Sequence, residues 1–106
     1  MKSPDSKAAP LSPENLDFCV GLFKTLADPT RLHLLNVLAT EQRPMTVGEI
    51  ADRVPIGQST VSHHLKALAG MRFVRSERAG TSTLYEVDVR GRERFDTAVR
   101  AILGRP

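Results

Sequence analysis

The sequence predicts a single, mostly α-helical domain with one small β-hairpin near its C-terminal end. The chain has 106 residues, a length for which one domain is the default. Apolar side chains recur at helical spacing in several stretches, and two β-like runs flank a turn that contains glycine. Hydrophobic residues make up 41% and charged residues 25% of the chain, which are ordinary values for a globular protein and exclude a disordered one.

The sequence also lacks the signals of several other protein classes. No apolar run approaches the roughly 18 residues needed to span a bilayer, and the N-terminal stretch has no apolar core of a secretory signal. Cys19 is the single cysteine, so no internal disulfide can form, and we expect a cytoplasmic protein without membrane contact. The motifs of metalloproteases, phosphate-binding loops and serine hydrolases are missing, so we expect no enzyme.

Basic residues concentrate in the second half of the chain. Residues 1–57 hold six Lys or Arg and seven Asp or Glu, a balance of −1, whereas residues 58–106 hold nine and five, a balance of +4. Together with an isoelectric point near 9.5, this distribution permits a polyanionic partner.

The first helix is expected to begin at Ser12, after a flexible tail of residues 1–11. Serine is a good N-cap, Pro13 suits the first helical position, and Glu14 favours the positive end of the helix dipole. Apolar side chains cover almost all of this helix, which indicates burial on two sides, against the core and against a partner chain. These apolar residues are Leu16, Phe18, Cys19, Val20, Leu22, Phe23 and Leu26.

A second helix is predicted from the same pattern of N-cap and proline at Asp28 and Pro29, and it ends before Pro44. The Asp28 side chain can accept a hydrogen bond from the backbone N–H of Arg31, so we interpret both residues as structural. The apolar side consists of Leu32, Leu34, Leu35, Val37 and Leu38, and His33 lies on the polar side.

The next two helices are short and joined by a turn. Residues 46–49 have the form of a capping box, with Thr46 as N-cap and Glu49 three residues later. After a break at residues 55–57, a further helix over about residues 58–69 directs Val61, Leu65 and Leu68 to the core and leaves a polar outer face. Two such helices form a helix-turn-helix arrangement.

The chain is expected to close with a hairpin and a helix. The β-like runs cover residues 73–78 and 83–87, around a turn at residues 79–82. The closing helix covers residues 92–103, and its apolar stripe consists of Phe95, Ala98, Val99, Ile102 and Leu103.

Three separated segments resemble the ArsR/SmtB family of bacterial transcriptional regulators. They are residues 26–32, residues 58–68 and the hairpin with Phe73, Val74, Gly80, Leu84 and Tyr85, and they match in order and spacing. The resemblance spans about residues 16–103. It implies a winged helix-turn-helix over residues 12–106, which dimerises through its first and last helices and binds a roughly palindromic DNA operator. Most members of this family repress transcription, and most lose DNA affinity when an effector binds.

The residues themselves support DNA binding. Short polar side chains such as Ser59, Ser62 and His63 fit a major groove about 12 Å wide, and Gln58 can pair with an adenine edge. The free backbone N–H groups at the start of that helix suit a phosphate, and basic side chains on the helix and hairpin can fix register. The predicted DNA contacts are Gln58, Ser59, Thr60, Ser62, His63, Lys66, Arg75 and Arg78. His64 lies nearer the flank, where it is expected to pack or cap locally.

The apolar stripes of the first and last helices predict a homodimer interface. Its residues are Phe18, Leu22, Phe23, Phe95, Val99 and Ile102. One position departs from the resemblance: Arg72 stands where the family usually has a glycine that ends the helix in a left-handed turn. Because Gly70 precedes it, the helix over residues 58–69 is expected to stop earlier.

Neither familiar metal site of the family is present. Thr46, Gly48 and Ala51 stand where soft-metal sensors carry cysteines. The family's other metal site lies on the last helix and uses an aspartate, a histidine two residues later and two further histidines. Here Asp88 is present, but Arg90 replaces the first histidine, and Ala101 and Gly104 stand near the positions of the other two. We therefore predict no metal and no cofactor, with Cys19 in the core and His33 solvated.

Some alternatives stay open. His33, with carboxylates such as Glu41 or with partner residues, could form a nickel or zinc site of a metal-responsive regulator. The other interpretations are that the protein responds to a small-molecule or protein effector, that it acts as an activator, or that it is a protein-interaction module that binds no DNA.

Overall fold

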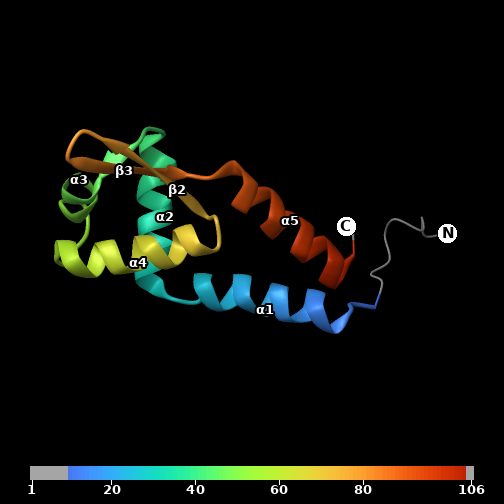
Figure 1. Ribbon diagram of the computed structural model, residues 1–106. Coiled ribbons are helices and arrows are strands. Elements are labelled where there is room, and N and C mark those ends of the chain that lie inside the picture. The colour runs from blue at the N-terminus through green and yellow to red at the C-terminus, as the bar shows by residue number, and fades with distance from the viewer. Residues whose placement is uncertain (1–9, 105–106) are drawn as a thin grey trace.

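The computed structural model describes residues 10–104, which form five helices and a three-stranded antiparallel sheet, with the first and last helices extending away from the sheet (Figure 1). The expected tail of residues 1–11 therefore lies mostly outside the described residues. The elements are α1 (Pro13–Leu26), α2 (Pro29–Glu41), β1 (Met45–Thr46), α3 (Val47–Ala51), α4 (Gln58–Gly70), β2 (Val74–Ala79), β3 (Ser82–Val87) and α5 (Val89–Leu103). This confirms the mostly helical winged fold.

Local side-chain chemistry starts the first three helices as expected. The Ser12 side chain accepts from the Asn15 N–H at 3.1 Å, and the Asp28 side chain accepts from the Arg31 N–H at 3.1 Å. At α3, Thr46 and Glu49 form both hydrogen bonds of the capping box. Each cap satisfies backbone donors that the first helical turn leaves free.

The sheet has one strand more than the hairpin that the sequence predicts. Its strand order is β1-β3-β2, with Met45 opposite Tyr85 and Thr46 opposite Leu84. Pairing with β3 ties the entry of α3 to the base of the hairpin, so the helix-turn-helix and the wing share one sheet. Other boundaries differ as well: α5 begins at Val89 rather than residue 92, and β2 and β3 cover Val74–Ala79 and Ser82–Val87 rather than residues 73–78 and 83–87.

The core lies where α2, α3, α4 and the sheet meet. The side chains with no exposed surface include Leu34, Met45, Ile50, Val61, Leu65 and Leu68. From α1, only Cys19 and Leu22 are buried, so most of that helix's apolar surface stays outside the core.

The end of α4 corrects the expectation that this helix stops early. It continues through Gly70, and Arg72 takes the left-handed position itself, with φ of 60°. The Phe73 N–H donates to the Leu68 carbonyl at 2.9 Å and the Arg72 N–H donates to the Ala69 carbonyl at 3.0 Å, which is a Schellman motif. The turn that glycine usually supplies is thus kept with an arginine.

The start of α5 packs directly on this turn. The Asp88 N–H donates to the Phe73 carbonyl at 2.9 Å. Gly91 is buried there, and a Cβ atom on it would overlap the Arg72 carbonyl and lie 2.8 Å from the Phe73 Cα. Only glycine allows this close approach, which sets where α5 leaves the sheet.

Candidate nucleic-acid interface

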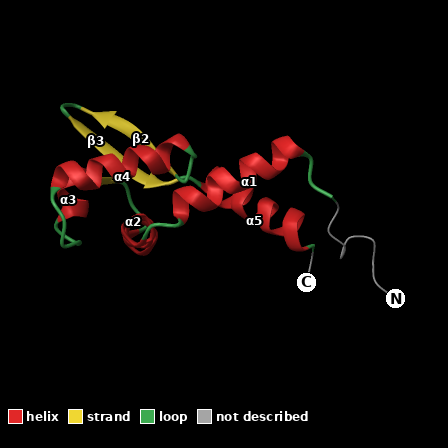
Figure 2. Cartoon of the chain, turned by 90° about the horizontal axis from the view of Figure 1, so that it is seen from below, coloured by secondary structure: helices red, strands yellow, loops and turns green. Residues whose placement is uncertain are grey.

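The outer face of α4 is polar and open to solvent. Figure 2 shows α3 at one end of the molecule, next to the start of α4, and α1 and α5 at the other. Because Val61, Leu65 and Leu68 are buried, the helix turns its opposite side outward. Of the predicted contacts on α4, Ser62 is half-buried and the others are exposed: Gln58, Ser59, Thr60, His63 and Lys66.

The N-terminus of α4 adds backbone donors to this face. Gly57 is its N-cap and offers no side-chain hydrogen bond. The N–H groups of the first turn therefore have no side-chain acceptor, and they lie at the positive end of the helix dipole. Such a helix end can bind a phosphate.

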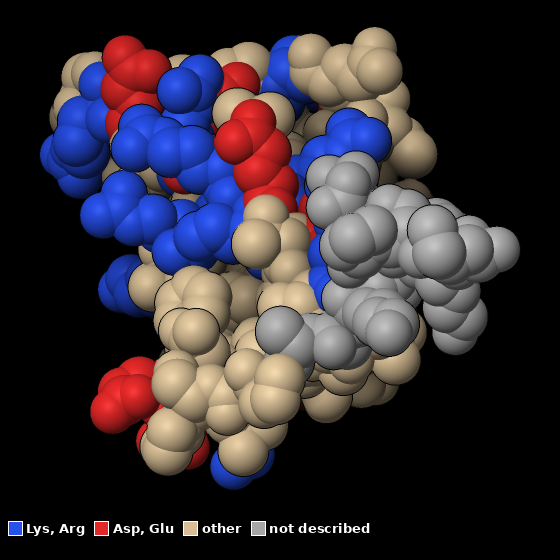
Figure 3. All heavy atoms as spheres, turned by 90° about the vertical axis from the view of Figure 1, so that its right-hand side faces the viewer, with Lys and Arg blue, Asp and Glu red and all other residues tan. Residues whose placement is uncertain are grey.

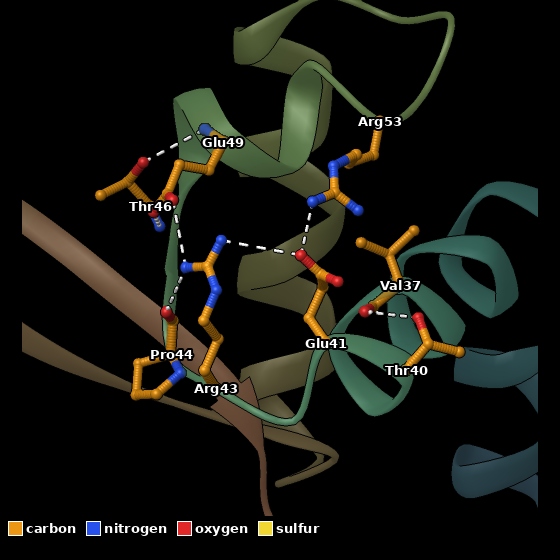
Figure 4. Close-up of polar contacts among 8 residues, drawn as sticks. All are labelled: Val37, Thr40, Glu41, Arg43, Pro44, Thr46, Glu49 and Arg53. Carbon is orange, nitrogen blue, oxygen red and sulfur yellow. Dashed lines mark hydrogen bonds and ion pairs between the residues drawn. The ribbon is translucent and has the colours of Figure 1, made fainter.

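Ion pairs hold α3 in place beside α2 (Figure 4). Glu41 at the end of α2 pairs with Arg53 after α3, and it lies 3.6 Å from the Arg43 guanidinium. Arg43 also pairs with Glu49 at 3.1 Å. The hydrogen bond from the Thr46 backbone, followed by Arg43, lowers the pKa of Glu49 below its ordinary value. Exposed pairs stabilise little, so their main effect is to orient the helix.

The two predicted arginines of the hairpin differ in their surroundings. Arg75 lies opposite Glu86 across the strands, and its Nε donates to that carboxylate at 2.6 Å. Arg78 lies opposite Thr83, close to the turn at Gly80, which has φ of 64°. Both side chains are exposed, but Arg75 is paired with Glu86, so Arg78 is the better placed of the two to meet a phosphate.

His64 contacts the end of α1 and the start of α2 through Arg31, and not a residue near it in sequence as expected. Its ring is half-buried, and Nδ1 accepts a hydrogen bond from Nε of Arg31 at 3.1 Å. Arg31 also donates through Nη1 to the Thr25 carbonyl at 3.3 Å. The hydrogen bond from the Arg31 backbone is the main cause that lowers the pKa of Asp28, and His64 adds to it. Sequence reasoning assigned Arg31 a structural role but missed this link to α4.

The predicted dimer residues divide between surface and core. Phe18 is 43% exposed, and Phe23 and Ile102 are also exposed. Phe95 is half-buried and packs edge-on against Phe23, with ring centroids 5.5 Å apart. Leu22 is 0% exposed within the single chain, so assigning it to an interface was wrong. Val99 is half-buried.

Other apolar side chains widen this surface. Leu32, which the sequence placed on the apolar side of the second helix, is 52% exposed, and Val89 and Leu103 of α5 are exposed as well. Over α1, Leu16 and Val20 are exposed as well. An apolar surface spread over α1, α2 and α5 is typical of a protein contact.

Positive charge gathers on α5 and not on the wing, whose two strands hold two arginines and two glutamates. The α5 sequence holds four arginines against one Glu and one Asp. Figure 3 views the end of the molecule where α1 and α5 lie, and Lys and Arg side chains gather over the upper part of that face, while its lower part is mostly neutral. Arg94 lies with its guanidinium 5.6 Å from the centre of the Phe18 ring.

His33 and Cys19 lie apart from the two neighbouring histidines of α4, His63 and His64. Within residues 10–104, no three His, Cys, Asp or Glu side chains are grouped to hold a metal ion. His33 is exposed as expected, and eight residues separate it from Glu41 on α2, about 12 Å along the axis, so the two cannot share one ion. Asp88 is buried as the N-cap of α5 and accepts from the Arg90 N–H at 2.9 Å. Cys19 is buried as predicted.

None of the described helices is both long and apolar enough to cross a membrane.

The chain resembles known transcription regulators in sequence. The profile of the family described as bacterial regulatory protein, arsR family, matches residues 28–76. The HTH-type transcriptional regulator KmtR of Mycobacterium tuberculosis is 38% identical over 84 residues, which cover 79% of this chain and 63% of KmtR. An uncharacterized HTH-type transcriptional regulator of Methanocaldococcus jannaschii is 38% identical over 74 residues, covering 70% of this chain and 82% of that protein.

A solved structure shares the fold and part of the sequence. It is the homodimeric winged helix-turn-helix DNA-binding domain of a possible ArsR-family regulator from Mycobacterium bovis, with a TM-score of 0.68 and 28% identity over 89% of this chain and 88% of that one. The matched profile contains α2, α3, α4 and the start of β2, the segments that build the polar face described above. The chain therefore belongs to the arsR family of bacterial regulatory proteins.

Proposed function

We propose that this regulator represses transcription as a homodimer that binds an inverted-repeat DNA operator. Residues 12–106 serve both DNA binding and dimerisation, and operator binding places the protein in the cytoplasm. Its activity rests on binding, with no catalytic step. The residues at the family's two familiar metal positions lack the needed ligands, so we propose no metal effector at either position.

The observation that carries the proposal is the outer face of α4. A helix with this much exposed polar surface, held by a buried apolar face and preceded by a capped short helix, is built to enter a major groove. Its side chains offer the donors and acceptors that read base edges, notably the Gln58 amide and the His63 imidazole. The uncapped helix start and Arg78 supply contacts to phosphates.

Dimerisation makes the operator symmetric. If two chains pair through the surface of α1 and α5, their α4 helices are related by a two-fold axis. The two helices then enter major grooves about 34–36 Å apart, one turn of DNA. The operator is expected to be an imperfect inverted repeat with half-sites at this spacing.

Selection from random DNA tests this proposal. Purified protein is incubated with a library of random-sequence duplexes, bound DNA is amplified over several rounds, and the enriched sequences are read. We expect an inverted repeat, bound much more tightly than a duplex in which one half-site is scrambled. Enrichment of no sequence, or equal binding of selected and random duplexes, would contradict the proposal.

A further inference from the structure

Arg31 joins three parts of the molecule through three hydrogen bonds. Its backbone N–H donates to the Asp28 side chain, its Nη1 donates to the Thr25 carbonyl, and its Nε donates to Nδ1 of His64. Thr25 lies in the last turn of α1, Asp28 is the N-cap of α2, and His64 is in the middle of α4. The planar guanidinium fixes the directions of its donors, so the contacts with Thr25 and His64 constrain each other.

The contact defines the proton state of His64. A ring nitrogen accepts a hydrogen bond only when it carries no proton, so the imidazole in this arrangement is neutral, with its proton on Nε2. Three groups lie around this ring, two from the start of α2 and one from α4 itself. They are the Arg31 guanidinium, the Asp28 carboxylate and the His63 ring, whose centroid lies 5.6 Å away. A second proton on His64 would remove the acceptor and place a cation against Arg31.

His64 stands next to the face that meets DNA. Successive residues of an α-helix point about 100° apart, so His64 lies on the flank adjoining His63. The buried residues Val61, Leu65 and Leu68 hold α4 against the core, but apolar packing is non-directional. A hydrogen bond from the flank supplies the direction that packing lacks, and it resists rotation of α4 about its own axis.

We propose that Arg31 and His64 are positioning residues for DNA reading, which set the rotation of α4 relative to the end of α1. The inference rests on the proposed function, because it concerns how the α4 face is presented to an operator. The link also connects α4 to the helix that carries Phe18 and Phe23, residues of the proposed dimer surface. Neither Arg31 nor His64 needs to touch a base for this role.

Two substitutions at His64 separate the hydrogen bond from the rest of the side chain. In His64→Asn the amide oxygen can occupy the place of Nδ1 and still accept from Arg31. In His64→Leu the side chain keeps comparable bulk but has no acceptor. Operator and random-duplex affinities are measured by fluorescence anisotropy. We expect His64→Leu to lose about tenfold or more in operator affinity, whereas His64→Asn stays close to the wild-type protein.

The pH profile gives a readout that general loss of stability would not produce. Lowering the pH until the imidazole takes a second proton is expected to weaken operator binding by the wild-type protein more than by His64→Asn, because only the imidazole can be protonated. Because His63 is present in both proteins, a pH effect of equal size in the two is not ascribed to His64. Nitrogen-15 NMR of the wild-type protein at neutral pH should show His64 with its proton on Nε2, and this measurement needs no variant to fold.

The proposal is overturned if His64→Leu binds the operator as tightly as the wild-type protein, if His64→Asn is as weak as His64→Leu, or if NMR places the proton on Nδ1. A failure of the proposed function is distinct from these results. In that case the wild-type protein itself would show no preference for the selected duplex over random DNA.

Discussion

Arg72 carries the main backbone strain at the junction between α4 and the wing. Its φ of 60° is in the left-handed region, which costs a non-glycine residue about 1–2 kcal/mol. The position is fixed by the two hydrogen bonds of the Schellman turn and by the start of α5, which packs on it. The strain is therefore maintained by the local hydrogen bonds of the turn together with long-range packing against α5.

Replacing this residue should release the strain. We expect Arg72→Gly to raise the free energy of unfolding by about 1 kcal/mol, because the gain in the folded chain exceeds the extra entropy of glycine in the unfolded chain. Urea denaturation followed by circular dichroism measures the change. Arg72→Ala is the matched control, since alanine keeps the strained Cβ and should give no gain. Equal stability of the glycine and alanine variants would contradict the account.

Arg78 should act on DNA through charge alone. Its exposed side chain lies near the tip of the wing, without the cross-strand carboxylate that Arg75 has. We expect Arg78→Ala to weaken binding to operator and random DNA alike. It should also reduce the slope of log affinity against log salt concentration by about one per protomer. Arg75→Ala should lower it less, because Glu86 already neutralises that guanidinium. Anisotropy titrations across a salt series measure both slopes, and a larger effect at Arg75 would exclude this assignment.

At the scale of an element, Gly91 decides how α5 meets the sheet. A methyl group there would overlap backbone atoms of Arg72 and Phe73, which have no flexible end to move aside. Gly91→Ala is expected to lower the free energy of unfolding by about 1–3 kcal/mol, despite the better helix propensity of alanine. Gly70→Ala, at a helical glycine with open space around it, should be neutral or stabilising. Denaturant unfolding of both variants tests the contrast, which fails if the two behave alike.

The free energy of unfolding should depend on pH in the acid range, because the N-cap of α2 is a carboxylate. The pKa of Asp28 is lower in the folded chain than its ordinary value, mainly through the hydrogen bond from the Arg31 backbone. Because the pKa of this carboxyl is lower in the folded chain, its stabilisation is complete at pH values above its pKa in the unfolded chain. The stabilisation is lost as the pH falls through its pKa in the folded chain. Asp28→Asn keeps a capping side chain without the charge. The difference in free energy of unfolding between the wild-type protein and Asp28→Asn, measured by urea titration at several pH values, should therefore shrink as the pH falls. A difference that stays constant with pH would contradict this role of the Asp28 carboxylate.

The sequence predicts elements whose signals are local and misses those that depend on distant partners. The starts of α1, α2 and α3 follow from Ser12, Asp28 and Thr46, because capping is chemistry within one turn. In contrast, β1 has two residues, too few for any period, and exists because Met45 pairs with Tyr85.

The candidate site divides in the same way. The exposed face of α4 follows from the spacing of its buried residues. The link between Arg31 and His64 joins positions 33 residues apart, so no local pattern reveals it. Leu22 was placed in the interface because α1 is apolar on nearly every side, and periodicity alone cannot separate core from partner contact.

For the whole molecule, the exposed apolar surface of α1 and α5 is the feature that a single chain leaves unexplained. Phe18, Phe23 and Ile102 all keep more than a third of their surface exposed. Fully burying an exposed phenylalanine side chain contributes about 1.5–3 kcal/mol, and covering the part of each side chain that is still exposed would contribute a share of that to the proposed dimer. This is the physical basis for the proposed homodimer.

Introducing a charge into this surface should separate the chains. We expect Phe18→Glu to convert a dimer at micromolar concentration into a monomer with unchanged helix content, because Phe18 lies outside the core. Analytical ultracentrifugation measures the mass, and circular dichroism checks the fold. Ser82→Glu, which adds the same charge on the wing, should remain dimeric. A monomeric wild-type protein at this concentration would refute the proposed assembly.

The central claim is that the outer face of α4 reads base sequence, and one comparison tests it most directly. His63→Ala and Ser62→Ala are titrated by fluorescence anisotropy against the selected operator and against a random duplex. The account predicts that each loses more affinity for the operator than for random DNA, by about 1–3 kcal/mol for each base contact removed. If both variants keep the wild-type ratio of operator to random affinity, α4 is not the reading element and the account is contradicted.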